Sequence, residues 1–167
     1  GVLLAIPSGL VVATGVFRLA NLVFPVPERM LEQFGADVFP KDIPLWQLVF
    51  FISILPAVCE EIAFRGTLLY GLRRKFRPVT LALIVGVIFG FFHVALFRIL
   101  PTAFLGVVLT AMALMTGSIL PGMVMHAGNN GLSLWLAETG FATGKLGWPW
   151  YLAAAGVFAL AFAILYH

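Results

Sequence analysis

The chain has 167 residues, of which 62% are hydrophobic and 10% charged, and its formal net charge is +3. Soluble domains are about 25% charged and about 45–50% apolar. This composition therefore excludes an ordinary soluble enzyme, a nucleic-acid-binding module and a disordered chain, because a soluble fold would expose large apolar patches. We expect a lipid bilayer around most of the surface.

The apolar runs are continuous rather than alternating, which is typical of transmembrane helices and not of barrel strands. At about 25 residues for each span and its loop, the length allows five or six spans. The sequence therefore predicts an all-α fold, a polytopic transmembrane helix bundle. We expect residues 1–167 to form a single membrane-embedded domain, and the start at Gly1 without a methionine predicts a fragment of a longer chain.

The first apolar run covers about residues 2–24 and is long enough to span a bilayer, although Pro7 and Arg18 interrupt it. Residues 25–40 follow, with apolar side chains at helical spacing and charged side chains between them. This pattern predicts a short amphipathic helix in the membrane interface, and a simple polar loop is the alternative. A second span is expected from about Leu45 to Leu72.

A basic cluster, residues 73–77, ends the second span. The third span is expected from Pro78 to near Phe97, and Arg98 and Pro101 mark a tight turn into a fourth span from about Thr102 to Thr116. A fifth span runs to about Ala137, and the last apolar run covers Trp148 to Tyr166. Cytoplasmic loops carry an excess of Lys and Arg, so we expect the basic cluster on the cytoplasmic side.

Helix rise gives a depth for the polar residues in these spans. Glu60 lies 13 residues before Arg73, and His93 lies 15 residues after Pro78. At about 1.5 Å per residue, the two side chains lie about 20 and 22 Å from the same membrane face. By the same count His126 is nearer the cytoplasmic face. We predict that Glu60, His93, His126 and Asn130 converge on one cavity that opens toward the cytoplasm.

Seven residues of the apolar spans are polar or charged. They are Glu60, Glu61, Arg65, His93, His126, Asn129 and Asn130. A charge inside a bilayer costs several kcal/mol and usually faces a cavity or a partner. These groups could simply pair with one another between helices. Seven of them on three neighbouring helices favour a functional site instead.

The spacing within the second span distinguishes the two glutamates. Glu61 and Arg65 are four residues apart on one helical face, in the favourable order, so we predict that Glu61 is the counter-ion of Arg65. Glu60 points about 100° away from that face. Because it lacks this partner, Glu60 suits a general base.

Three segments together resemble a known family. Residues 60–65 read EEIAFR, residues 89–93 read FGFFH, and residues 126–130 read HAGNN. They resemble the motifs EExxxR, FxxxH and HxxxN of the CPBP intramembrane endopeptidases, the CAAX protease and bacteriocin-processing family, which includes the Ras-converting CAAX endopeptidase. The resemblance covers about residues 45–137.

The resemblance implies an intramembrane endopeptidase that hydrolyses a peptide bond of a membrane-associated peptide or protein. In this interpretation Glu60 takes a proton from water, and His93 holds that water. His126 and Asn130 donate hydrogen bonds to the oxyanion. Glu61 and Arg65 support the helix that carries Glu60.

No cofactor is favoured, but zinc is the alternative. Glu60, His93 and His126 could form a His₂Glu zinc site with an open fourth position. The sequence contains no HExxH motif, and Asn130 would be a poor zinc ligand. Metal-free activation of water is therefore the first interpretation.

Two non-enzymatic alternatives stay open. The first is a binding or immunity protein that keeps the polar cluster to hold a ligand. The second is a transport-associated membrane domain, although the sequence shows no inverted symmetry or paired broken helices. In every case we expect a multi-pass integral membrane protein, in the plasma membrane if the source is prokaryotic, with lipid rather than nucleic acid around it.

Overall fold

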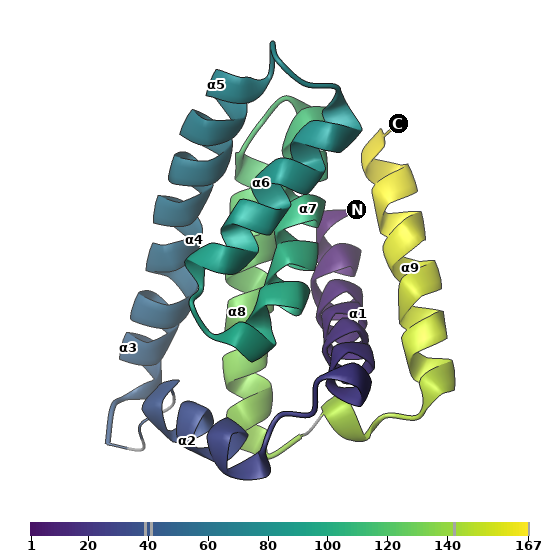
Figure 1. Ribbon diagram of the computed structural model, residues 1–167. Coiled ribbons are helices and arrows are strands. Elements are labelled where there is room, and N and C mark those ends of the chain that lie inside the picture. Colours follow the sequence, from purple (N-terminus) through teal and green to yellow (C-terminus); the bar gives the residue numbers. More distant parts are fainter. Residues whose placement is uncertain (39, 41, 142, 167) are drawn as a thin grey trace.

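A computed structural model describes residues 1–38, 40, 42–141 and 143–166. Throughout these residues the regular structure is helical, which confirms the predicted all-α bundle (Figure 1). The long elements that pack together are α1 (Val2–Val23), a continuous helix over Leu45–Leu72, α6 (Pro78–Phe92), α7 (Ile99–Thr116), α8 (Leu120–Thr139) and α9 (Trp148–Tyr166).

Four helical segments of the described chain are long and apolar enough to cross a membrane. They are Val2–Val23, Leu45–Leu72, Leu96–Thr116 and Trp148–Tyr166. The apolar helix α6 is shorter, with 15 residues, and α8 has sufficient length but carries the polar groups of the third motif. The chain is thus an integral membrane protein, with four clear spans where the sequence predicted five or six.

The second span is one helix with two wider, π-helical segments. It consists of α3 (Leu45–Leu48), η1 (Val49–Ile54), α4 (Leu55–Glu61), η2 (Ile62–Leu69) and α5 (Tyr70–Leu72), of which η1 and η2 are π-helical. Such segments are rare and occur frequently at functional sites. Here they flank α4, which ends with Glu60 and Glu61.

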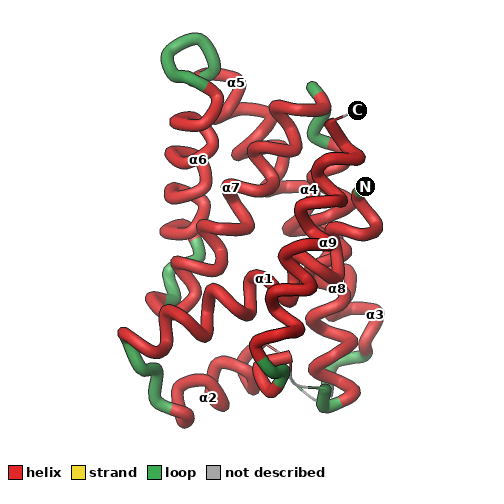
Figure 2. Tube along the Cα trace, turned by 90° about the vertical axis from the view of Figure 1, so that its right-hand side faces the viewer, coloured by secondary structure: helices red, strands yellow, loops and turns green. Residues whose placement is uncertain are grey.

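The predicted amphipathic helix is present as α2 (Glu28–Val38). Residue 39 of the predicted range lies outside the described residues. In Figures 1 and 2, α2 lies at one end of the bundle, and the turn between α5 and α6 lies at the other end. The Phe34 ring packs edge-on against Phe97 at 5.2 Å. The location of α2 in a membrane interface stays a prediction.

The third and fourth spans differ from the sequence prediction at their shared turn. Helix α6 ends at Phe92, not near Phe97, because Val94 has a φ of 60° and the Ala95 amide donates to the His93 carbonyl at 2.6 Å. A left-handed φ is strained for a β-branched residue. A 3₁₀ turn, η3 (Leu96–Arg98), follows, and α7 begins three residues earlier than predicted. Pro101 is accommodated in its first turn, where a missing N–H costs little.

Helices α6 and α7 pack backbone against backbone. A Cβ atom added to Gly86 would lie 2.6 Å from the Val107 nitrogen, and one added to Gly106 would lie 2.9 Å from the Gly86 carbonyl oxygen. Small residues permit this close approach inside a membrane. The contact fixes the end of α6, and therefore His93, against α7.

Candidate active site

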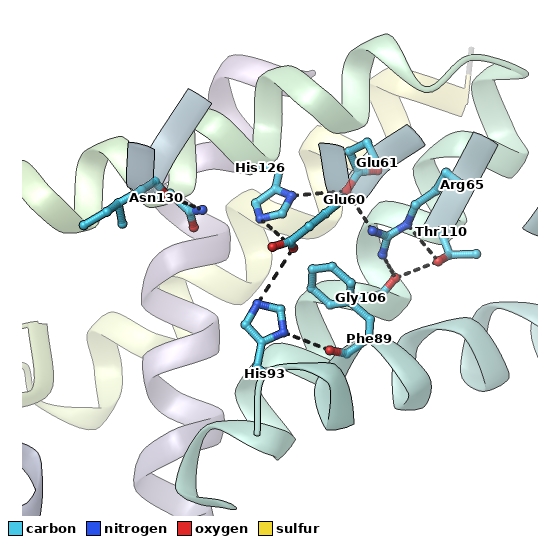
Figure 3. A network of polar contacts seen from close by, with 10 residues as sticks. Glu60, Glu61, Arg65, Phe89, His93, Gly106, Thr110, His126 and Asn130 are labelled. Atoms are coloured by element: carbon cyan, nitrogen blue, oxygen red, sulfur yellow. Dashed lines mark hydrogen bonds and ion pairs between the residues drawn. The ribbon is translucent and has the colours of Figure 1, made fainter. Parts of the chain in front are cut away.

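Three side chains from three helices meet in the middle of the bundle (Figure 3). The Glu60 Oε2 atom lies 3.8 Å from His93 Nε2 and 3.9 Å from His126 Nε2. Glu60 comes from α4, His93 follows the last residue of α6, and His126 belongs to α8. The three residues therefore lie at one depth. The count of residues along the predicted spans had placed His126 nearer the cytoplasmic face.

Each imidazole is oriented by its second nitrogen. His93 Nδ1 lies 2.9 Å from the Phe89 carbonyl oxygen, and His126 Nδ1 lies 3.2 Å from Glu61 Oε1. Because both partners are acceptors, each Nδ1 carries the proton and donates it. The Nε2 atoms then face Glu60. The Phe89 ring packs between the two imidazoles, with centroids 4.8 Å from His93 and 5.7 Å from His126.

The space between these three groups is rich in acceptors. Glu60 Oε2 is buried and has no hydrogen-bond partner among the described residues. Gaps of 3.8 and 3.9 Å are too long for direct hydrogen bonds, but they suit a water molecule about 2.8 Å from both atoms. A water has only two hydrogens for three acceptors. The cluster therefore presents more acceptors than one water molecule can satisfy, and it can hold and polarise water.

A buried ion pair supports the cluster. Arg65 Nη1 lies 2.7 Å from Glu61 Oε1, and both side chains are fully buried. The guanidinium also donates to the Gly106 carbonyl at 2.7 Å and to Thr110 Oγ1 at 3.3 Å. Its donors therefore connect the second span to α7, while Glu61 reaches α8 through His126.

Asn130 lies beside the cluster and not within it (Figure 3). Its Nδ2 atom donates to the Ile52 carbonyl at 3.2 Å. Pro56 has no N–H to offer that carbonyl, four residues earlier in the helix, so the oxygen can accept the side chain. Asn130 also lines both cavities at the site.

Two adjoining cavities reach the cluster. One has a volume of about 490 Å³ and is lined by Glu60, His93 and Asn130, and the other, of about 300 Å³, is lined by His93, His126 and Asn130. Both are also lined by Phe34 of α2 and by Arg98.

The position of these cavities relates the site to the basic residues 73–77. They border α2, at the opposite end of the bundle from the basic cluster at residues 73–77 (Figures 1 and 2). The basic residues 73–77 and the opening of the site were both expected on the cytoplasmic side. In this fold they lie at opposite ends of the bundle, and which end faces the cytoplasm stays a prediction.

Arg98 and Asn129 belong to the cavity walls but were not among the predicted site residues. Arg98 appeared as part of a turn, and Asn129 appeared only as one of several buried polar groups. Both line both cavities. An arginine between two apolar spans was a signal in the sequence, but only the packing of α2 against η3 brings it to the site.

The three residues named for the zinc alternative converge, but their distances differ from those of a tetrahedral zinc site. Two ligands of a tetrahedral zinc ion lie about 3.4 Å apart. The Nε2–Oε2 distances of 3.8 and 3.9 Å are longer. Within the described part of the chain, no three His, Cys, Asp or Glu residues form a group that could hold a metal ion.

Comparison with protein families gives a match that covers the candidate site. Residues 42–132 match the family model described as type II CAAX prenyl endopeptidase Rce1-like. The matched range includes the cluster, the ion pair, Arg98 and Asn130. No curated protein and no solved structure matched the chain.

Proposed function

Because this chain belongs to the Rce1-like type II CAAX prenyl endopeptidase family, we propose that it hydrolyses a peptide bond of a membrane-associated peptide or protein. One observation carries the proposal. A carboxylate oxygen and two imidazole nitrogens, Glu60 Oε2 and the Nε2 atoms of His93 and His126, face one another at 3.8–3.9 Å beside a cavity. This arrangement suits the activation of water.

In the first step, water donates hydrogen bonds to Glu60 and His93, and Glu60 takes one proton as the water oxygen attacks the peptide carbonyl carbon. The new C–O bond produces a tetrahedral oxyanion. Glu60 then returns the proton to the peptide nitrogen, and the C–N bond breaks. The products are a carboxylic acid and an amine, so the elements of one water molecule are consumed.

His126 is the proposed donor to the oxyanion. Its Nδ1 lies 3.2 Å from the buried Glu61 carboxylate, which fixes the orientation of the ring. When both ring nitrogens carry a proton, both are donors, and the Nε2–H that faces the site can donate to the oxyanion. A donor of this kind contributes about 3–4 kcal/mol to transition-state stabilisation.

Asn130 is the second proposed donor. An amide nitrogen has two N–H groups, and the Ile52 carbonyl occupies one of them at 3.2 Å. The other N–H is available to the cavity that Asn130 lines with His93 and His126. Its contact with Ile52 fixes the orientation of the side chain.

The proposal can be tested with purified protein in liposomes. Two fluorogenic peptides would be added in H₂¹⁸O, one with an S-farnesyl cysteine followed by three residues at its C-terminus, and one with a single hydrophobic anchor and no prenyl group. We expect cleavage of at least one peptide, with one ¹⁸O atom in the new carboxylate by mass spectrometry.

The Glu60→Gln variant is the matched control, because it keeps the shape of the side chain and removes the base. We expect its cleavage rate to fall by about a hundredfold or more. Cleavage by the parent that survives in this variant would contradict the role of Glu60. Absence of cleavage of either peptide by a folded parent would favour a binding protein on the same scaffold.

A further inference from the structure

Arg98 is a cation at the site whose guanidinium forms no close ion pair within the described chain. It is the last residue of η3 and caps the N-terminus of α7. No carboxylate of the described chain forms an ion pair with its guanidinium, and no described side chain or carbonyl accepts a hydrogen bond from it. The guanidinium carbon lies 5.0 Å from the centre of the Phe34 ring. The charge of Glu60 acts on Arg98 from beyond ion-pair distance, without direct contact.

Arg98 lies in the walls of the cavities at the candidate site. The residue is half-buried and lines both cavities together with His93 and Asn130. A guanidinium is always charged and presents five N–H donors in a fork that matches a carboxylate. In a membrane protein such a group faces a cavity or a partner. Here it faces the cavity that leads to Glu60.

A second unpaired group in the same walls points to a polar ligand. Asn129 is 8% exposed, and its Oδ1 atom has no hydrogen-bond partner among the described residues. It lines both cavities as well. Buried amides are normally hydrogen-bonded, so an unsatisfied one in a cavity wall is an acceptor for an incoming N–H group. A peptide supplies both an N–H group and, at its end, a carboxylate.

The other charges limit where an anion can bind. Glu60 and Asp37 line the larger cavity with Arg98, and both are acidic. A carboxylate is repelled by these two side chains and attracted by Arg98. The first turn of α7 adds the positive end of a helix dipole, since Pro101 and Thr102 line the smaller cavity. The favourable position for an anion is therefore at Arg98.

We propose that Arg98 binds a carboxylate of the peptide substrate and so selects which peptide bond reaches Glu60. The inference rests on the proposed hydrolytic function. The carboxylate is either the C-terminus of the peptide or an acidic side chain near the cleaved bond. Both have the chemistry that the guanidinium recognises, and the experiment distinguishes them.

The test measures binding separately from cleavage. Four fluorescent S-farnesylated peptides with three residues after the cysteine are compared. Two differ only at the terminus, a free acid against an amide, and two amidated peptides differ by Glu against Gln next to the cysteine. Kd is measured by fluorescence anisotropy in the Glu60→Gln protein with Arg98 present, and in its Arg98→Gln and Arg98→Lys derivatives. Arg29→Gln is the matched control, because Arg29 is an exposed cation on α2 that lines neither cavity.

With Arg98 present, we expect one acid-containing peptide to bind about ten- to a hundredfold more tightly than its neutral partner. Preference in the first pair identifies the C-terminus, and preference in the second identifies a side chain. Arg98→Gln should reduce that ratio to about one, Arg98→Lys should leave an intermediate ratio, and Arg29→Gln should preserve it. In the enzyme with Glu60, the same loss should appear in KM and not in kcat.

Equal Kd values for acid and neutral peptides with Arg98 present would overturn the proposal, and so would a ratio that survives in both Arg98 variants. Equal weakening of all four peptides would indicate a structural role and would also overturn it. Affinity that depends on anionic lipid and on Arg98, but not on the peptide carboxylate, would assign the arginine to a lipid headgroup. Carboxylate-dependent binding without cleavage by the parent would reject the hydrolytic function and keep the subsite.

Discussion

His126 and Glu61 contact each other through Nδ1 and Oε1 at 3.2 Å, and the same Glu61 oxygen lies 2.7 Å from Arg65. One carboxylate oxygen therefore serves both the candidate catalytic cluster and the ion pair that supports it. The neighbouring residue, Glu60, has no such bond and faces the cavity. The two adjacent glutamates consequently have different physical roles, which mutation can separate.

Replacement of Glu61 by Gln should destabilise the fold. It leaves the fully buried Arg65 without its counter-charge, and breaking a buried ion pair costs about 3–5 kcal/mol. We expect this decrease in the free energy of unfolding, measured by denaturation in detergent. Glu60→Gln is the control and should unfold at nearly the parent midpoint. Equal destabilisation by both substitutions would contradict the separate roles.

The metal-free proposal and the zinc alternative predict different zinc contents for the purified protein. Under the metal-free proposal, activity should persist after exhaustive chelation, and elemental analysis should find well under one zinc per chain. Activity that persists after chelation does not by itself exclude zinc, because zinc that leaves a buried site slowly gives the same result. His126→Ala supplies the second measurement. Stoichiometric zinc in the parent that is lost from this variant would reject metal-free activation and keep the peptidase assignment.

Helices α6 and α7 should not tolerate a methyl group between them. In Gly86→Ala the new Cβ would lie 2.6 Å from the Val107 nitrogen and 3.0 Å from the Ala103 carbonyl oxygen. Overpacking of this kind costs about 1–3 kcal/mol. We expect a lower melting temperature and a lower cleavage rate, because α6 carries His93. Gly71→Ala, where nothing lies within 4 Å of the added atom, should melt like the parent. Matching losses in the two variants would argue against backbone contact.

The two ends of the bundle should be accessible from opposite sides of the membrane. Single cysteines at Lys75, in the basic cluster, and at Glu32, on α2, would be introduced after Cys59→Ser, which removes the one native cysteine. A membrane-impermeant maleimide should label one position in right-side-out vesicles and the other in inside-out vesicles. Labelling of both positions from one side would contradict this orientation. The result also decides whether the basic cluster or the site opening faces the cytoplasm.

Much of the fold followed from residue patterns because the signals are local. Continuous apolar runs predicted the helices, and a four-residue spacing predicted the Glu61–Arg65 pair. The end of α6 could not be predicted, since it depends on a left-handed Val94, a conformation that this residue type disfavours. The first turn of α7 was missed because Pro101 was interpreted as a break rather than as a tolerated early helical residue.

The candidate site could be predicted only in part from such local patterns. Residue counts brought Glu60 and His93 to one level, but a count along one helix contains no information on which end of a cavity is open. That property depends on α2, whose Phe34 meets Arg98 from a distant part of the chain. Arg98 and Asn129 acquire their proposed roles only through this packing.

The two π-helical segments of the second span also affect how this helix responds to changes in length. A π turn holds one more residue than an α turn. The π-helical segments Val49–Ile54 and Ile62–Leu69 flank Glu60 and Glu61. Each segment therefore contains more residues than α-helical turns would need. A single-residue deletion in either segment can be absorbed by a return to α-helical turns, without rotating the glutamates away from the histidines. We therefore expect this fold to tolerate a one-residue deletion on either side of the glutamate pair, but not within the pair.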